Sequence, residues 1–197
     1  MFQILFLAAV AAVVLYQLYA TLGRRVGRQP EDAPATALPS ATGSAPDGPA
    51  ALSAEGVATL KSRQPDFDPG KFLAGARSAY EQIVTAYAAG DRETLKPLLA
   101  PEVMDNFEQA MAARETAGRT EKVEFLTPPR LDLEKVDVIG DVAKAVVRIL
   151  AEVRTRTKDE RGEGVDDRRT AELWTFEREV KSANPNWQLS FVAAAEA

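Results

Sequence analysis

The side chains with which this chain could do chemistry are few, because its 197 residues include no histidine and no cysteine. These two residue types supply the commonest general base, the thiolate nucleophile and most neutral metal ligands. A serine–histidine or cysteine–histidine nucleophile system is therefore impossible. Carboxylates, lysine, tyrosine and serine remain. The composition favours a protein that is not an enzyme, and we expect no catalytic, cofactor-binding or metal site.

Three carboxylates deserve testing as acids or bases, namely Asp66, Asp68 and Asp91. All three stand where helices are expected to begin. Asp68 is followed by Pro69, a pair that is typical of a helix N-cap and the first helical position. We therefore interpret the three aspartates as groups that stabilise helix N-termini, and not as catalytic residues.

Both tryptophans of the chain lie within residues 171–190. Apolar and polar residues alternate on either side of an Asn-Pro-Asn turn, and this pattern predicts a β-hairpin. The favoured interpretation is that the tryptophans pack into the core of a sheet. The predicted inward faces carry Trp174, Phe176 and Val180 in the first strand and Trp187, Leu189 and Phe191 in the second.

A hollow between a curved sheet and a helix is the alternative explanation for the tryptophans. Such a hollow could hold an apolar ligand or a peptide, whereas the favoured interpretation leaves it filled by side chains. The candidate pocket residues are Tyr80, Val84, Trp174 and Trp187.

A charged stretch, residues 154–169, precedes this hairpin and is expected to be a loop. The pattern is typical of a solvated hairpin tip, and the alternative is a surface that binds a protein partner. Basic and acidic residues are interleaved here, so binding to nucleic acid is not expected. The cations of the candidate partner loop are Arg154, Arg156, Lys158, Arg168 and Arg169.

Four helices are predicted before the strands. The longest begins at Asp68 and ends at Gly90, and its apolar residues recur at helical spacing. The other predicted helices cover residues 53–64, with Ser53 as the N-cap, residues 91–100 and residues 101–118. The inward positions are Phe72, Ala76, Tyr80, Ile83, Val84 and Tyr87 in the longest helix and Val103, Phe107, Ala110 and Met111 in the last.

Strand patterns of period two follow the helices, and this order predicts the α+β class. A tight turn at Gly140 and Asp141 joins two strands, and the tryptophan hairpin adds two more. We expect helices packed on one face of a curved, four-stranded antiparallel sheet. The inward face of the strand that begins at Val142 is wholly apolar and comprises Ala143, Ala145, Val147, Ile149, Ala151 and Val153.

The N-terminal segment, residues 2–23, carries no charged side chain. At about 1.5 Å per residue it is long enough to span a hydrocarbon core of about 30 Å. Arg24, Arg25 and Arg28 follow it directly. By the positive-inside rule we predict a transmembrane helix over residues 1–23, with the N-terminus outside and the rest in the cytoplasm. The alternative is a cleaved signal peptide, whose positive charge would precede the apolar run.

Residues 24–52 form a basic flank and a segment rich in proline, alanine, glycine and serine, for which we predict a disordered tether. The chain has 24 basic and 29 acidic residues, of which 21 and 26 lie beyond residue 52. This acid excess should not attract anionic lipids to the domain as a whole. We expect weak or no direct lipid binding by residues 53–197.

Three segments, LWTFEREVKSANPNWQLS, DFDPGKFLAGARSAYEQIVTAYAAGD and LLAPEVMDNF, resemble the Tim-forty-four-like (Tim44-like) family. The resemblance covers residues 65–191 and places a Tim44-like domain at 65–197. It implies a cone of helices against a curved antiparallel sheet, similar to nuclear transport factor two. The founding member is a mitochondrial inner-membrane import subunit that tethers a seventy-kDa heat-shock chaperone and contacts cardiolipin, so the resemblance implies a scaffold.

The chain departs from that founding member because it has its own predicted span and lacks the long basic region before the domain. The resemblance therefore implies tethered binding of a protein partner, with chaperone or translocase components as candidates. We expect a non-catalytic adaptor at the cytoplasmic face of a bacterial inner membrane, linked to protein translocation, insertion or quality control. The alternative class is a cone-fold enzyme, or a carrier of lipid or another small ligand, that acts at the membrane.

The predicted topology can be tested with a reporter that is active only in the periplasm, fused after Ala197. The reporter should stay silent, because the arginines after the apolar run resist translocation. The same reporter fused to a secreted protein provides the positive control. Activity of the fusion would show that the apolar segment is inserted the other way round or is cleaved.

Overall fold

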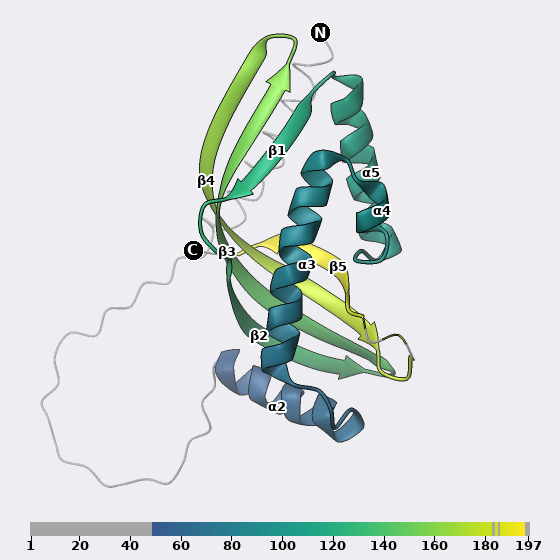
Figure 1. Cartoon of the computed structure of the whole chain (residues 1–197). Coiled ribbons are helices and arrows are strands. Elements are labelled where there is room, and N and C mark those ends of the chain that lie inside the picture. The colour runs from purple at the N-terminus through teal and green to yellow at the C-terminus, as the bar shows by residue number, and fades with distance from the viewer. Residues whose placement is uncertain (1–48, 183, 185, 196–197) are drawn as a thin grey trace, which may run out of the picture. The chain divides into compact units, whose positions relative to one another are not determined.

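The computed structural model describes residues 49–182, 184 and 186–195 (Figure 1). The predicted membrane span and most of the predicted tether lie outside the described residues. No helix among the described residues is long and apolar enough to cross a membrane. Helices come first along the chain and strands second, which confirms the α+β class. The helices are α2 (Pro49–Arg63), α3 (Pro69–Ala89), α4 (Arg92–Leu95) and α5 (Pro101–Thr116), and the strands are β1 (Thr120–Phe125), β2 (Arg130–Ile139), β3 (Val142–Asp159), β4 (Gly162–Glu179) and β5 (Gln188–Ala194).

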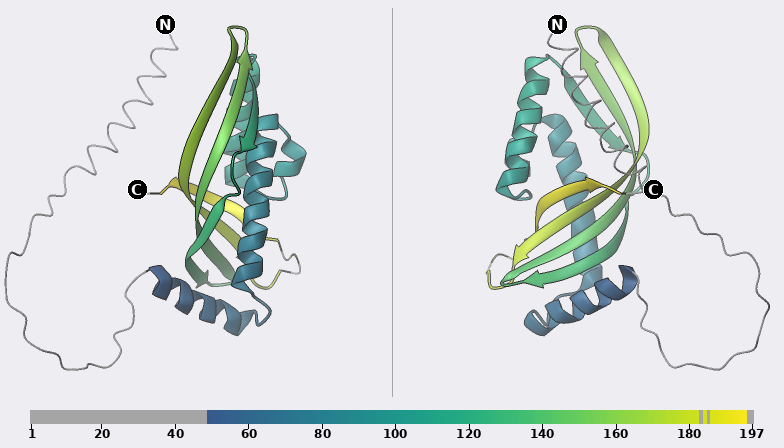
Figure 2. Two further views of the ribbon diagram at one scale, coloured as in Figure 1. Left: turned by 60° about the vertical axis from the view of Figure 1, so that its left-hand side comes forward. Right: turned by 180° about the vertical axis from the view of Figure 1, so that it is seen from behind.

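The sheet is antiparallel and strongly bent, but it has five strands and not the predicted four (Figure 2). The strand missed by the sequence analysis is β1, which is short and carries charged residues at three of its six positions. β1 and β2 both pair with β3, one after the other along its length. β4 pairs with the other edge of β3, and β5 pairs with β4.

β3 is the strand on which the sheet is built, because it pairs with β4 along its whole length of 18 residues. The predicted tight turn is confirmed, since Gly140 and Asp141 join β2 to β3. Gly140 has a φ of 60°, a conformation that favours glycine in two-residue hairpin turns. The predicted apolar face of β3 is also confirmed, because all six side chains are at most 4% exposed: Ala143, Ala145, Val147, Ile149, Ala151 and Val153.

A β-bulge in β5 changes which side chains face the core. Leu189 pairs with Phe176, whereas Phe191 pairs with Thr175, so Ser190 is the extra residue. The Ser190 hydroxyl donates to the Thr175 carbonyl (3.2 Å). A bulge reverses the alternation beyond it, and the prediction that Phe191 faces inward with Leu189 is therefore wrong. Phe191 points to the opposite face and is 61% exposed.

α3 lies along one face of the sheet, here called the inner face (Figures 1 and 2). Its predicted ends are confirmed. The Asp68 side chain accepts a hydrogen bond from the Lys71 amide (2.7 Å), and Gly90 ends the helix in the left-handed conformation with a φ of 74°. Asp91 caps α4 as predicted. The buried residues of α3 include Phe72, Ala76, Tyr80 and Ile83, as predicted, whereas Val84 and Tyr87 are half-buried.

α2 shares a hydrophobic core with α3 and the sheet. It begins at Pro49, four residues before the predicted N-cap Ser53, so the end of the predicted tether is helical. Leu60 is fully buried, and Gly56 lies directly against the backbone of Val136 in β2. The helix is thus packed against the domain and is not a separate element between the tether and the domain.

The C-terminal end of α2 is tied to the β2–β3 turn. Arg63 donates to the Gly140 carbonyl and to the Asp141 carboxylate, the latter at 2.7 Å. Lys181 donates to the same carboxylate (2.9 Å). Hydrogen bonds from Lys181 and Arg63 lower the pKa of Asp141. These hydrogen bonds stabilise the folded protein while Asp141 is ionised. Because the pKa of Asp141 is lowered in the folded state, the stabilisation is present above the ordinary aspartate pKa and is lost as pH falls through the lowered value.

α5 lies beyond α3 and is largely exposed (Figure 2). Val103 and Met111 are buried as predicted. Phe107 is half-buried against Tyr87, with 4.8 Å between ring centroids. Ala110 is exposed, contrary to prediction, because its side of the helix contacts neither α3 nor the sheet. Two ion pairs hold the end of α5, namely Arg92 with Glu115 (2.9 Å) and Arg114 with Glu121 (2.7 Å).

The close approach of α2 to β2 gives a test of this packing. A Cβ at Gly56 would lie 1.7 Å from the Val136 carbonyl oxygen, an overlap that the backbone must relieve by moving. Gly56→Ala should therefore lower the free energy of unfolding by about 2–3 kcal/mol, although alanine favours a helix by about 1 kcal/mol. Denaturant midpoints measure the change.

Gly75→Ala in α3 is the matched control. Nothing lies within 4 Å of a Cβ at Gly75, so this substitution should be neutral or stabilising. A Gly56→Ala protein as stable as the Gly75→Ala protein would show that α2 does not pack on β2 as described.

Candidate functional site

Two recesses lie on the inner face, and they divide the four candidate pocket residues. Tyr80, Val84 and Trp174 line a cavity of about 220 Å³. Trp187 lines a larger groove near the start of α3. The reason is that the two tryptophans contact different turns of α3. Trp174 packs against Tyr80 with 4.7 Å between ring centroids, whereas Trp187 packs against Phe72, two helical turns earlier, at 4.8 Å.

The smaller cavity is largely filled by its own side chains. Tyr80 is 2% exposed, and burial raises its pKa to about 12. Trp174 Nε1 donates to the Glu172 carboxylate (2.9 Å). Thr170 Oγ1 is buried and lies beside the Tyr80 hydroxyl, with which it can hydrogen-bond. The space that remains is below the range of roughly 300–1,000 Å³ that is usual for small-ligand sites.

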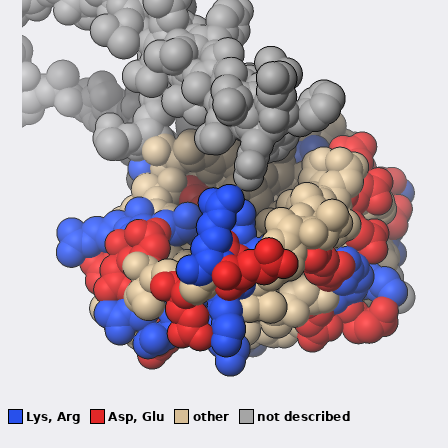
Figure 3. Space-filling view, turned by 90° about the horizontal axis from the view of Figure 1, so that it is seen from above, with Lys and Arg blue, Asp and Glu red and all other residues tan. Residues whose placement is uncertain are grey.

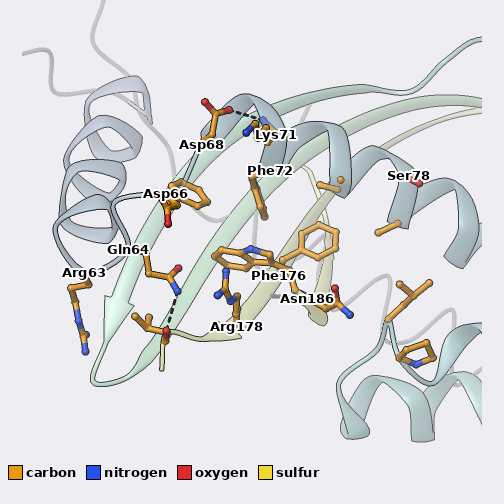
Figure 4. Close-up of a pocket in the computed structure, with 18 of the residues that line it drawn as sticks. Arg63, Gln64, Asp66, Asp68, Lys71, Phe72, Ser78, Phe176, Arg178 and Asn186 are labelled. Carbon is orange, nitrogen blue, oxygen red and sulfur yellow. Dashed lines mark hydrogen bonds between the residues drawn. The ribbon is translucent and has the colours of Figure 1, made fainter. Parts of the chain in front are cut away.

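The larger groove has a volume of about 850 Å³ and lies between the α2–α3 connection, the first half of α3 and the facing ends of β4 and β5 (Figure 4). Its floor is aromatic, with Phe72 at the centre. The Phe72 ring lies 4.8 Å from Trp187, 5.9 Å from Phe67 and 6.1 Å from Phe176, measured between centroids. Trp187 is half-buried, so part of the indole faces the groove.

One cation, Arg178, lies among these aromatic residues (Figure 4). It follows Phe176 by two residues in β4 and therefore shares the inner face of the strand. Its cross-strand neighbour is Ala143, whose methyl group offers no acceptor. Arg178 Nε is buried and has no hydrogen-bond partner within the described part of the chain. The groove thus contains a guanidinium with one buried donor, Nε, that no described residue satisfies.

The walls of the groove carry amides, a hydroxyl and carboxylates (Figure 4). Gln64 donates to a backbone carbonyl (2.9 Å), and Gln82 donates to the Ser78 hydroxyl (3.0 Å). Asp68 caps α3 as predicted, so Asp66, two residues earlier, is not the cap that the sequence suggested. No group of three or more acidic side chains among the described residues could hold a metal ion.

The sequence of the folded region matches a known family. Residues 53–194 match the Tim44-like domain, and this match covers more than half of the chain. The chain belongs to the Tim44-like family. The match includes α2, in agreement with the shared core. No protein of curated function matches the chain by sequence.

One solved structure supports the fold of this Tim44-like domain. The intermembrane space region of the chloroplast protein ARC6 aligns with a TM-score of 0.51 and 16% identity over 68% of this chain and 100% of that one, a likeness that shows the fold alone. An NTF2-like family protein from Streptomyces avermitilis has a TM-score of 0.39 with 20% identity, over 66% of this chain and 100% of that one. An NTF2-like superfamily protein from Salmonella enterica has a TM-score of 0.38 with 11% identity, over 72% of this chain and 94% of that one. The last two scores are too low to carry an argument.

The candidate partner loop of the Tim44-like domain is not a loop. Residues 154–159 and 162–169 are the paired ends of β3 and β4, because the alternation of that hairpin continues through its charged part. Lysines and arginines lie side by side with carboxylates at this end of the molecule (Figure 3). Three of the five predicted cations are engaged within the hairpin: Arg154 with Asp167 (2.7 Å), Arg169 with Glu152 (2.7 Å) and Lys158 with Glu163 (3.3 Å).

Phe67 and Arg178 are groove residues that the sequence analysis missed. Arg178 could have been found, because the alternation that runs from Trp174 through Phe176 to Val180 passes through it. Phe67 lies between two aspartates, outside any helix or strand, so no periodic pattern marks it as buried.

The two tryptophans of the Tim44-like domain should differ in their contribution to stability. Trp174 is 3% exposed, and Trp174→Ala should cost about 3–5 kcal/mol. Trp187 is half-buried beside the groove, so Trp187→Ala should cost about 1–2 kcal/mol. Lys158→Ala is the surface control and should cost under about 0.5 kcal/mol. Denaturant midpoints decide, and equal losses for the two tryptophans would place Trp187 in the core.

Proposed function

We propose that this Tim44-like protein is a non-catalytic adaptor at the cytoplasmic face of a bacterial inner membrane, and that its domain binds a protein partner in protein translocation, insertion or quality control. The observation that carries the proposal is the groove of about 850 Å³ with its aromatic floor. Aromatic residues and arginine are the side chains that most often dominate the energy of a protein interface. Phe72, Trp187 and Arg178 provide this combination in one recess.

A polypeptide segment fits the groove better than a reacting substrate does. The side-chain amides of Gln64, Gln82 and Asn186 line the walls, and such amides can both donate to and accept from a peptide main chain. Catalysis would instead require an acid or base held within reach of the substrate. The titratable groups Asp66 and Lys71 are exposed on the rim, where nothing fixes their positions against a reacting atom.

A carrier of a small ligand is the alternative function, and it would use the cavity beside Tyr80. The hydroxyl groups of Tyr80 and Thr170, which both line this cavity, are the observation in its favour. The volume of about 220 Å³ is small for such a role. The larger groove is therefore the better candidate site.

The predicted anchor would increase the local concentration of the adaptor near its partner. The predicted tether, about 24 residues long, would have a root-mean-square reach of roughly 25–30 Å if it is a random coil. A domain held at that distance meets membrane-bound partners at high effective concentration without binding lipid itself. The groove can then bind its partner weakly and still be occupied in the cell.

Site-specific crosslinking of the full-length protein in cells tests the proposal. A photoreactive amino acid at Ser78, which is exposed in the groove wall, should give a discrete protein adduct. The same amino acid at Asp132, which is exposed on β2 outside the groove, is the matched control and should give at least about fivefold less adduct, because residues outside an interface stay in water. Equal adducts at both positions, or adducts with lipid only, would contradict the proposal.

A further inference from the structure

Three carboxylates near this end of the sheet are engaged with groups other than Arg178. Asp141 accepts from Arg63 and Lys181, and Glu177 accepts from Lys144 on the other face of the sheet (2.6 Å). Asp68 is directed to the α3 N-terminus. No ion pair of Arg178 exists within the described part of the chain, and its Nε lacks any hydrogen-bond partner there.

A buried donor without a partner destabilises the folded protein, because it has lost water and gained nothing in exchange. The cost is removed when an acceptor enters the groove. A carboxylate is the acceptor that best fits a guanidinium, since its two oxygens match two parallel N–H donors. The domain therefore carries a buried Nε donor in the groove lined by Phe176 and Trp187, and a carboxylate that entered the groove would satisfy it.

Resting on the adaptor function proposed above, we propose that the groove recognises an extended segment of the partner protein in which a carboxylate binds Arg178 and a nearby large apolar side chain packs on Phe72 and Trp187. The carboxylate is that of an aspartate, a glutamate or a C-terminal residue. This assigns a partner chemistry to the groove, and it makes Arg178 the residue that sets specificity.

The spacing within the groove defines the motif. Phe176 marks the edge of the aromatic floor, and Arg178 lies two residues along the same face of β4. Residues two apart on a strand are separated by about 6.5–7 Å, which is also the distance between alternate side chains of an extended peptide. The expected motif therefore has the apolar residue and the acidic residue separated by one position.

A protein carboxylate is a better occupant than a lipid headgroup. Anionic membranes bind through clusters of several exposed cations, whereas the Nε of Arg178 is buried. Of the other two cations that line the groove, Arg63 is paired with Asp141 and Lys71 lies at the rim. Asp66 and Asp68 stand at the rim and would face an anionic surface. An extended peptide can pass between these rim carboxylates and place one carboxylate on Arg178.

The test is a selection from a library of random heptapeptides displayed on phage, carried out on the full chain in phosphatidylcholine nanodiscs. Peptides enriched on the wild-type protein should share a large apolar residue and an aspartate or glutamate at the expected separation. Replacing that acid by its amide should weaken binding about tenfold or more, which is the loss expected for a charged hydrogen-bonded pair. This comparison leaves the protein unchanged and so does not depend on how a variant folds.

Arg178→Gln should remove the preference for the acid but keep the preference for the apolar residue. Arg156→Gln, which changes the same residue type at an exposed position of the β3–β4 hairpin, is the matched control and should select the same peptides as wild type. Thermal unfolding verifies that both variants are folded. Arg178→Lys should give partial loss, because lysine keeps the charge but not the fork of donors.

Enriched peptides without an acidic residue, or an acid preference that survives Arg178→Gln, would overturn the inference and leave the adaptor function intact. No enrichment at all would overturn both the inference and the proposed use of the groove. Binding that appears only when phosphatidylglycerol is added to the nanodiscs, and that requires Arg178, would assign the site to a lipid headgroup and overturn the inference.

Discussion

The apolar inner face of β3 is the feature on which the rest of the domain depends. Small side chains on β3 lie beside large rings on β4, with Ala145 paired to Phe176 and Val147 paired to Trp174. This arrangement leaves room for α3 to bring Phe72 and Tyr80 against those rings. The result is a chain of aromatic contacts along the sheet, and both recesses open beside it. Larger residues on β3 would push α3 away from the sheet and would change the shape of both recesses.

Local signals explain the parts of the fold that the sequence predicts well. The caps at Asp68 and Gly90 depend on a few neighbouring residues, and the inner face of β3 depends on a simple alternation. The bulges are different, because one inserted residue reverses the pattern. The register shift between Leu133 and Lys135 in β2 moves the apolar positions from 131 and 133 to 136 and 138. The one at Ser190 in β5 leaves no such mark, because Phe191 and Val192 are both apolar. Contacts between segments that are distant in the sequence, such as those of α2 with β2, cannot be predicted from local patterns.

The candidate site was predicted only in part for the same reason. Trp174 and Trp187 were correctly placed near helix α3, but which turn of the helix each one meets depends on the path of the chain between β4 and β5. Phe67 was not identified because it lies in a connection. Arg178 was overlooked because an arginine in an alternating strand is ordinarily assigned to solvent, and only the arrangement of its neighbours shows that it faces inward.

The charged half of the β3–β4 hairpin serves a purpose that differs from that of Arg178. β5 pairs only with Glu172–Glu177 of β4, so no strand among the described residues pairs with the outer edge of β4 at the hairpin end. Exposed ion pairs such as Arg154 with Asp167 are each worth only about 0–1 kcal/mol. Charged residues along such an edge discourage pairing with another chain. The hairpin therefore gains resistance to aggregation, while cations such as Arg154 and Arg169 pair with carboxylates of the hairpin itself.

The docking of α2 has a mechanical consequence. Any pulling force carried by the chain before Pro49 enters the domain through α2, and it acts on the sheet through the contact of Gly56 with Val136 in β2. Arg63 and Gln64, at the far end of the same helix and just beyond it, line the groove. Load on the helix would thus be transmitted to the wall of the groove, so that a partner bound there would be coupled to tension in the chain.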